Sequence, residues 1–130
     1  MRIDNFEELE VYKKAREFRK EVYRLANQLP EKEKFNLRPQ MMSAARSITN
    51  NIAEGFGRYH YQENIQFCRQ ARGSINELLD DLNICLDENY IDKEIIEKLK
   101  LQAYELIKIL NGYIAYLKRS KSELNNSITQ

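Results

Sequence analysis

Residues 10–30 of the chain read EVYKKAREFRKEVYRLANQLP. The apolar side chains of this stretch recur at steps of four and three, at Val11, Ala15, Phe18, Val22, Leu25 and Leu29. Such spacing lines up side chains along one face of an α-helix, whereas a strand would alternate. Asp4 or Asn5 can cap the helix, and Pro30 stops it because proline has no amide proton. We therefore predict a helix over residues 5–29.

The same spacing returns three times further along the chain. The later seams are Met41, Ala45, Ile48 and Ile52, then Ile65, Cys68, Ile75, Leu78 and Leu82, then Ile96, Leu99, Ala103, Leu106, Leu110, Tyr113 and Leu117. They predict helices over residues 37–54, 60–88 and 92–118, and the short connections favour antiparallel neighbours. The expected fold is all-α, an up-down-up-down antiparallel four-helix bundle over residues 1–120, with 121–130 as a flexible polar tail.

The composition agrees with one small helical domain. The 130 residues are 42% hydrophobic, enough for a core, and 32% charged, with four Gly and two Pro. No apolar stretch reaches the length of a signal peptide or a membrane span, so we expect a cytoplasmic protein with no membrane association. Cys68 and Cys85 lie seventeen residues apart in helical segments. We expect both in the core rather than in a disulfide or a metal site.

Two glycines carry expectations about packing. Gly55 follows the second seam, and the run Gly55-Phe56-Gly57 suggests that the helix ends there in a turn. Gly73 falls in the middle of the third predicted helix, where it costs about 1 kcal/mol relative to alanine. We therefore expect Gly73 in close contact with another helix, at the small side chains of the second one.

The sequence offers few groups for catalysis. His60 is the only histidine, so the Glu-x-x-His pairs of di-iron bundles are absent, and most zinc sites and histidine-dependent reactions lack their key group. The run Gly55-Phe56-Gly57 lacks the lysine and the preceding strand of a phosphate-binding loop. The acidic pairs Asp80-Asp81 and Asp87-Glu88 are expected on the solvated surface, because adjacent helical residues diverge. We predict no enzyme activity, no catalytic residue, no cofactor and no metal.

Polar residues of the second and third predicted helices are spaced to share faces. Arg46, Asn50 and Glu54 follow one another at four-residue steps, and Ser74 and Glu77 lie three apart. If these faces meet, Arg46 can pair with Glu77, and Ser74 with Asn50 or its neighbour. Glu54 opposes the helix dipole and should find a donor in a nearby arginine at position 58 or 72. We interpret the five residues as a structural polar network, with a ligand site as the alternative.

Charge is uneven along the chain. Residues 1–73 carry fourteen Lys or Arg against ten Asp or Glu, and residues 74–130 carry seven against ten, within a net charge of +1. The candidates for contact with nucleic-acid phosphates are Arg38, Arg46, Arg58, Arg69 and Arg72. Aromatic side chains near Arg58, at Phe56, Tyr59 and Tyr61, could stack on bases or equally anchor a subunit interface.

The middle of the chain carries a specific resemblance. Residues 47–58 read SITNNIAEGFGR and residues 71–78 read ARGSINEL. Together with LEVY at 9–12, LP at 29–30 and LRPQ at 37–40, they closely resemble the bacterial four helix bundle protein family, also called 23S rRNA-intervening sequence proteins. The resemblance covers about residues 5–120, which is essentially the whole predicted fold.

This resemblance implies several properties. Members of the family are up-down four-helix bundles that tend to form ring-like homopentamers, and some are encoded within insertions in the large-subunit ribosomal RNA gene. A related branch, the accessory variability determinant of diversity-generating retroelements, binds nucleic acid and a reverse transcriptase through a basic surface. No catalytic residues are established for the family, so none carry over.

Two functions are therefore weighed. The first is a non-catalytic, homo-oligomeric bundle protein of the 23S rRNA-intervening sequence type that binds RNA or DNA through a basic surface, with a protein such as a reverse transcriptase as a further partner. The alternative is a structural or protein–protein interaction module with no nucleic-acid role. Binding that weakens steeply with salt separates the first from the second, because neutralised phosphates release counterions.

Overall fold

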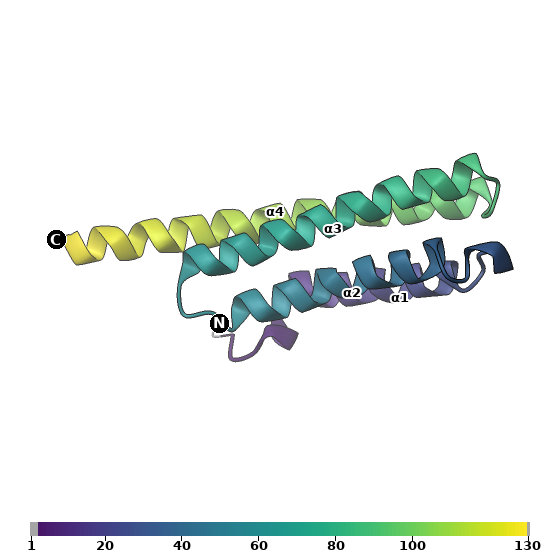
Figure 1. Ribbon diagram of the computed structural model, residues 1–130. Coiled ribbons are helices and arrows are strands. Elements are labelled where there is room, and N and C mark those ends of the chain that lie inside the picture. Colours follow the sequence, from purple (N-terminus) through teal and green to yellow (C-terminus); the bar gives the residue numbers. More distant parts are fainter. Residues whose placement is uncertain (1–2, 130) are drawn as a thin grey trace.

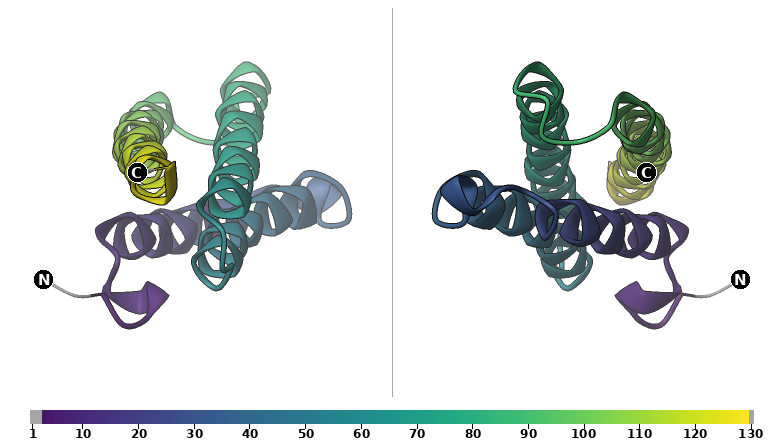
Figure 2. Two further views of the ribbon diagram at one scale, coloured as in Figure 1. Left: turned by 90° about the vertical axis from the view of Figure 1, so that its left-hand side faces the viewer. Right: turned by 90° about the vertical axis from the view of Figure 1, so that its right-hand side faces the viewer.

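The computed structural model describes residues 3–129, with the side chains of residues 3–127, and this part of the chain contains helices and no strand. Its α-helices are α1 (Glu10–Ala26), α2 (Leu37–Phe56), α3 (Tyr61–Asp87) and α4 (Lys93–Thr129). Successive helices run in opposite directions, and α1 also packs against α4 and closes the bundle (Figures 1 and 2). The predicted all-α, up-down-up-down four-helix bundle is confirmed.

The predicted seams form the core of this bundle. Phe18 of α1, Ile48 of α2, Leu82 of α3 and Leu106 of α4 are among its largest fully buried side chains. Burial of one such side chain contributes roughly 1.5–3 kcal/mol, so the seams supply the main stabilisation of the fold.

Both cysteines lie in this core as free thiols. Desolvation by burial raises the pKa of Cys68 to about 12 and that of Cys85 to about 11. Both therefore stay protonated near neutral pH and behave as small apolar side chains, as expected.

The first helix is shorter than the predicted 5–29. Phe6–Glu8 form a separate 3-10 turn (η1). Asn5 caps this turn, and its side-chain oxygen accepts a hydrogen bond from the backbone amide of Glu7 at 2.9 Å. Leu9 is extended, so α1 begins only at Glu10. Asn27 to Leu29 form a turn rather than the last helical residues, because the chain must reverse before Pro30.

The start of α2 is fixed by Glu33 rather than by the side chain of Asn36. Glu33 lies in a second 3-10 turn, η2 (Glu31–Glu33), and its Oε1 accepts the amide of Leu37 at 3.2 Å. Its Oε2 accepts the hydroxyl of Tyr90 at 2.7 Å. One carboxylate therefore holds both the start of α2 and the turn between α3 and α4.

The two glycines have roles opposite to those predicted. Gly55 does not end a helix in a turn but lies inside α2, which continues to Phe56. A Cβ added at Gly55 would lie 2.7 Å from Oδ1 of Asn64 and 2.9 Å from Cβ of Phe67, so its missing side chain lets α3 approach. Gly73 makes no such contact, since nothing lies within 4 Å of a Cβ built there. The expectation of a close helix contact at Gly73 is wrong.

The last helix is longer than the predicted 92–118. α4 continues to Thr129 and extends past the rest of the bundle (Figure 1). Residues 119–129 lack an apolar seam, but they contain no Gly or Pro, and the absence of a seam argues against packing rather than against helix. Lys121 ties this extension to α3 by donating to Oε1 of Gln62 at 2.7 Å. Of the predicted tail, Gln130 lies outside the described residues.

Candidate functional site

A chain of polar groups joins α2 to α3 in the middle of the bundle. The Ser74 hydroxyl donates to Oγ of Ser47 at 2.9 Å. The amide of Asn51 donates to the carbonyl oxygen of Ser47 at 2.8 Å and to its Oγ at 3.0 Å. Contrary to expectation, Ser74 therefore pairs directly with neither Asn50 nor Asn51; Ser47 lies between Ser74 and Asn51. Asn50, the other candidate, is exposed.

The expected pair of Arg46 and Glu77 is wrong. Arg46 donates to the hydroxyl of Tyr23 on α1 at 3.1 Å, whereas Glu77 is an exposed residue of α3. The reason is helical geometry: Arg46 and Ser47 are adjacent, so they point about 100° apart, and only Ser47 faces α3. Glu54 does find the expected donor, because its Oε1 lies 2.9 Å from a terminal nitrogen of Arg58.

The candidate arginines do not form one surface. Arg38 donates to the carbonyl oxygens of Ala26 at 3.2 Å and Leu29 at 3.4 Å, and so satisfies the C-terminal end of α1. Arg38 and Arg58 lie at opposite ends of α2, about 30 Å apart at 1.5 Å per residue. Arg72 faces α4 and donates to Asn111 at 2.7 Å, and Arg69 is exposed.

The strongest candidate site lies at the end of the bundle where α2 connects to α3. A hollow of about 370 Å³ opens there, within the size range of ligand pockets, about 300–1,000 Å³. We name it the tyrosine hollow, because its lining includes Tyr59, Tyr61, Tyr113 and Tyr116. The α2–α3 connection and the start of α3 supply the first two tyrosines, and α4 supplies the other two.

Two further hollows, of about 400 and 320 Å³, lie beside the tyrosine hollow. The first of them shares Tyr59, His60 and Tyr61 with the tyrosine hollow. The second shares Gln62 and Lys121 with the first. Across these hollows the charged lining residues are Arg58, Lys118 and Lys121, which we name the cationic rim. No carboxylate is among the described residues that line them, so the lining itself favours an anion, although Glu54 beside the hollow is paired with Arg58.

Asn64 and Tyr113 form a hydrogen-bonded polar pair in the lining of the tyrosine hollow. Asn64 is 6% exposed, and its amide donates to the hydroxyl of Tyr113 at 3.2 Å. Burial raises the pKa of Tyr113 to about 12, so its hydroxyl keeps its proton. The Tyr113 and Tyr116 rings are stacked, with centroids 6.3 Å apart and planes 15° from parallel.

Sequence reasoning missed most of this site. The sequence pattern places Tyr113 in the core seam, and Lys118 and Lys121 at the end of the last helix and in the tail. It brings together only the neighbours Phe56, Arg58, Tyr59 and Tyr61. The i, i+3 spacing of Tyr113 and Tyr116 was a usable signal, because it puts two aromatic rings on neighbouring parts of one helix face.

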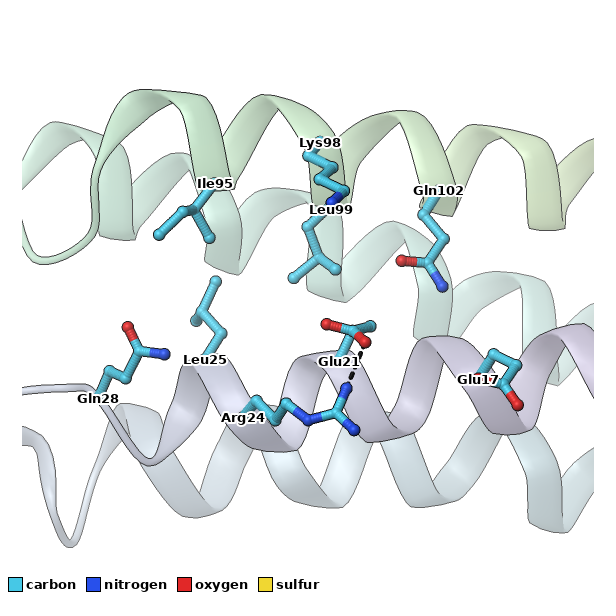
Figure 3. Close-up of a pocket in the computed structure, with 9 residues that line it drawn as sticks. All are labelled: Glu17, Glu21, Arg24, Leu25, Gln28, Ile95, Lys98, Leu99 and Gln102. Atoms are coloured by element: carbon cyan, nitrogen blue, oxygen red, sulfur yellow. Dashed lines mark hydrogen bonds and ion pairs between the residues drawn. The ribbon is translucent and has the colours of Figure 1, made fainter.

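A second type of hollow lies between α1 and α4, with a volume of about 360 Å³ (Figure 3). Leu25 of α1 and the side chains of Ile95 and Leu99 of α4 point toward one another across it. Its charged lining is balanced, with Glu17 and Glu21 against Arg24 and Lys98. A neighbouring hollow on α4 shares Lys98 and leads to Leu101, which is 71% exposed. This surface mixes apolar with polar side chains, and its charges are balanced rather than cationic.

One carboxyl group is buried at the contact of α2 and α3. Asp81 was expected on the surface but is only 2% exposed. Its Oδ1 accepts a hydrogen bond from the side-chain amide of Gln40 at 3.0 Å, and its Oδ2 has no partner among the described residues. Desolvation, assisted by the charges of Glu77 and Asp80, raises its pKa to about 6. Among the described residues no three His, Cys, Asp or Glu side chains gather where they could hold a metal ion.

Fold and site together define an antiparallel helical bundle whose most developed surface feature is an aromatic hollow beside a cationic rim. The chain belongs to the 23S rRNA-intervening sequence protein family, which it matches over residues 7–112. No helix of the described residues has the length and apolar character needed to cross a membrane.

A solved structure supports the same assignment. The chain is similar to a protein of unknown function from the S23 ribosomal protein family of Bacteroides thetaiotaomicron, with 26% identity and a TM-score of 0.74. The similarity covers 80% of this chain and 97% of that one. No curated protein matches the chain.

Proposed function

We propose that this protein is a non-catalytic nucleic-acid-binding protein that contacts RNA or DNA phosphates with the cationic rim. The observation that carries the proposal is the lining of the adjoining hollows, where all the charged side chains are positive. Lys118 has an exposed side chain, and Arg58 uses one terminal nitrogen on Glu54 and keeps further N–H donors. The small net charge is no obstacle, because local charge and not the total governs a phosphate contact.

The test is equilibrium binding of labelled RNA and DNA oligonucleotides, measured by fluorescence anisotropy over a salt series. We expect log K to fall linearly with log salt concentration. The double variant Lys118→Gln/Lys121→Gln should weaken binding and lower the slope by about 1.4 for a single strand, since each lost phosphate contact removes about 0.7.

The matched control is Lys32→Gln/Lys34→Gln, which removes the same charge from exposed positions in the α1–α2 connection, at the end of the bundle away from the cationic rim. This control should bind like the unmodified protein. Affinity that does not change with salt, or an equal loss in both double variants, would overturn the assignment of the cationic rim.

We also propose that the protein self-associates through the outer face of α4. Leu101 and Tyr104 are 71% and 58% exposed there, and contact with a second copy would remove them from water. In a ring this face would pack against a different surface of the next copy. The family resemblance makes a homopentamer the expected assembly. Sedimentation should show one oligomer that Leu101→Glu dissociates; a monomer at all concentrations would refute self-association.

A further inference from the structure

We propose that the tyrosine hollow holds an unpaired base of a single-stranded nucleic acid while the adjacent phosphates lie against the cationic rim. The inference rests on the proposed function and adds the form of nucleic acid and the group that is recognised. It assigns binding roles to Tyr59, Tyr113 and Tyr116.

The first argument is the arrangement of aromatic rings. Tyr59 is 94% exposed and Tyr116 is 54% exposed, so neither ring contributes fully to the core of the bundle. Tyr116 extends the stack begun by the half-buried ring of Tyr113 and lines the hollow. Bases stack on exposed aromatic rings of this kind regardless of sequence, because every base has a π-face.

The second argument is a positioned polar group. The Tyr113 hydroxyl accepts a hydrogen bond from buried Asn64, and its own proton has no acceptor among the described residues. It can therefore donate to a carbonyl oxygen or ring nitrogen on the edge of a base. The Cys68 thiol in turn donates to Oδ1 of Asn64 at 3.6 Å and holds its side chain in place. The hydroxyl group of Tyr113 is therefore positioned before a ligand binds.

The third argument concerns the size and charge of the site. A paired base inside a duplex is stacked and presents only its edge, whereas a hollow of about 370 Å³ has room for a base turned out of the strand. Arg58 and Lys121 line the tyrosine hollow and its neighbour, within reach of phosphates that flank such a base. A peptide would gain from the aromatic rings but would not require a lining whose charges are all positive.

The test compares two single-stranded probes of equal length and charge, an oligothymidine and an abasic oligomer with the same phosphate backbone. Unmodified protein should bind the oligothymidine about 5- to 150-fold more tightly, the range for one base–aromatic stack. Tyr116→Leu and Tyr59→Leu should each lower this ratio. Phe35→Leu, at an exposed aromatic side chain in the α1–α2 connection at the opposite end of the bundle, is the matched control and should leave it unchanged.

The outcomes separate this inference from the proposed function. Salt-dependent binding of both probes with equal affinity would overturn the base pocket and leave the proposed function standing. Binding of neither probe would overturn the base pocket, and the absence of binding to RNA and duplex DNA as well would overturn the proposed function. If Tyr116→Leu changes the mass in solution but not the probe ratio, the hollow is a protein interface and the inference is wrong. Because Tyr59 is almost fully exposed, its variant loses no buried contact, and a lowered ratio there cannot be ascribed to unfolding.

Discussion

The hydroxyl groups of Ser47 and Ser74 meet at 2.9 Å, and this contact fixes how α2 faces α3. Asn51 donates to the same Ser47 oxygen, so one small side chain connects three residues on two helices. The helices are close enough for such short side chains to touch because Gly55, further along α2, leaves room for Asn64 and Phe67 of α3.

Ser47→Ala and Ser74→Ala should each lower the free energy of unfolding by about 1 kcal/mol, the usual net value of one hydrogen bond. The double variant should cost less than the sum, because both single changes remove the same contact. Urea denaturation of the four proteins gives the coupling energy. Ser43→Ala, at an exposed position of α2, is the control, and strict additivity of the two test substitutions would contradict the contact.

Alanine at the two glycines should have opposite effects. Gly55→Ala places a methyl group within 3 Å of two α3 atoms and should destabilise the fold by about 1–3 kcal/mol, as overpacking does. Gly73→Ala meets no atom and should stabilise it by roughly 0.5–1 kcal/mol through a smaller loss of backbone entropy. Thermal unfolding should therefore shift down for one variant and up for the other, and shifts of the same sign would disprove the assigned roles.

These glycines also show what the sequence could and could not predict. The period of the apolar residues predicts which face of each helix is buried, and the four helices follow from it. A glycine gives no such signal, because it is compatible with a turn, a close approach or an open surface. The choice depends on which residues of the neighbouring helix lie opposite, and that is known only from the packed structure.

The candidate site was predictable only in part for a related reason. Arg58, Tyr59 and Tyr61 are neighbours in the chain and are recognised together. Tyr113 and Tyr116 come from a helix some fifty residues further on, and they join the site only because α4 packs beside α3. A pattern within one helix does not reveal that partnership.

The stability of the protein should depend on pH through Asp81. Its pKa is raised from 3.8 in the unfolded chain to about 6 in the fold, so the folded state binds the proton more tightly. Asp81 therefore destabilises the fold above pH 6, and this penalty should disappear as the pH falls from about 6 toward 4.

The comparison that isolates this effect is Asp81→Asn, measured by urea denaturation at several pH values. The variant should be more stable than the unmodified protein at pH 7.5, with a difference that shrinks as the pH falls through about 6. Asp87→Asn removes an equal charge from an exposed position of the same helix and should give a difference that changes little over this range. A constant difference for Asp81→Asn would show that its carboxyl group does not titrate as described.

Arg38 and Lys118 should separate stability from binding. The guanidinium of Arg38 is bound to carbonyl oxygens at the end of α1, so Arg38→Gln should lower the free energy of unfolding by roughly 1.5–3 kcal/mol, as loss of hydrogen bonds from a charged group does. Its nucleic-acid affinity should be unchanged once the protein is folded.

Lys118→Gln should show the reverse, with an unchanged free energy of unfolding and weaker, less salt-dependent binding. Its side chain is exposed and lines a hollow of the cationic rim, so the substitution removes a phosphate contact without removing a buried one. Urea denaturation and fluorescence anisotropy on the same two variants measure stability and binding separately. A loss of affinity in folded Arg38→Gln would show that Arg38 does contact nucleic acid.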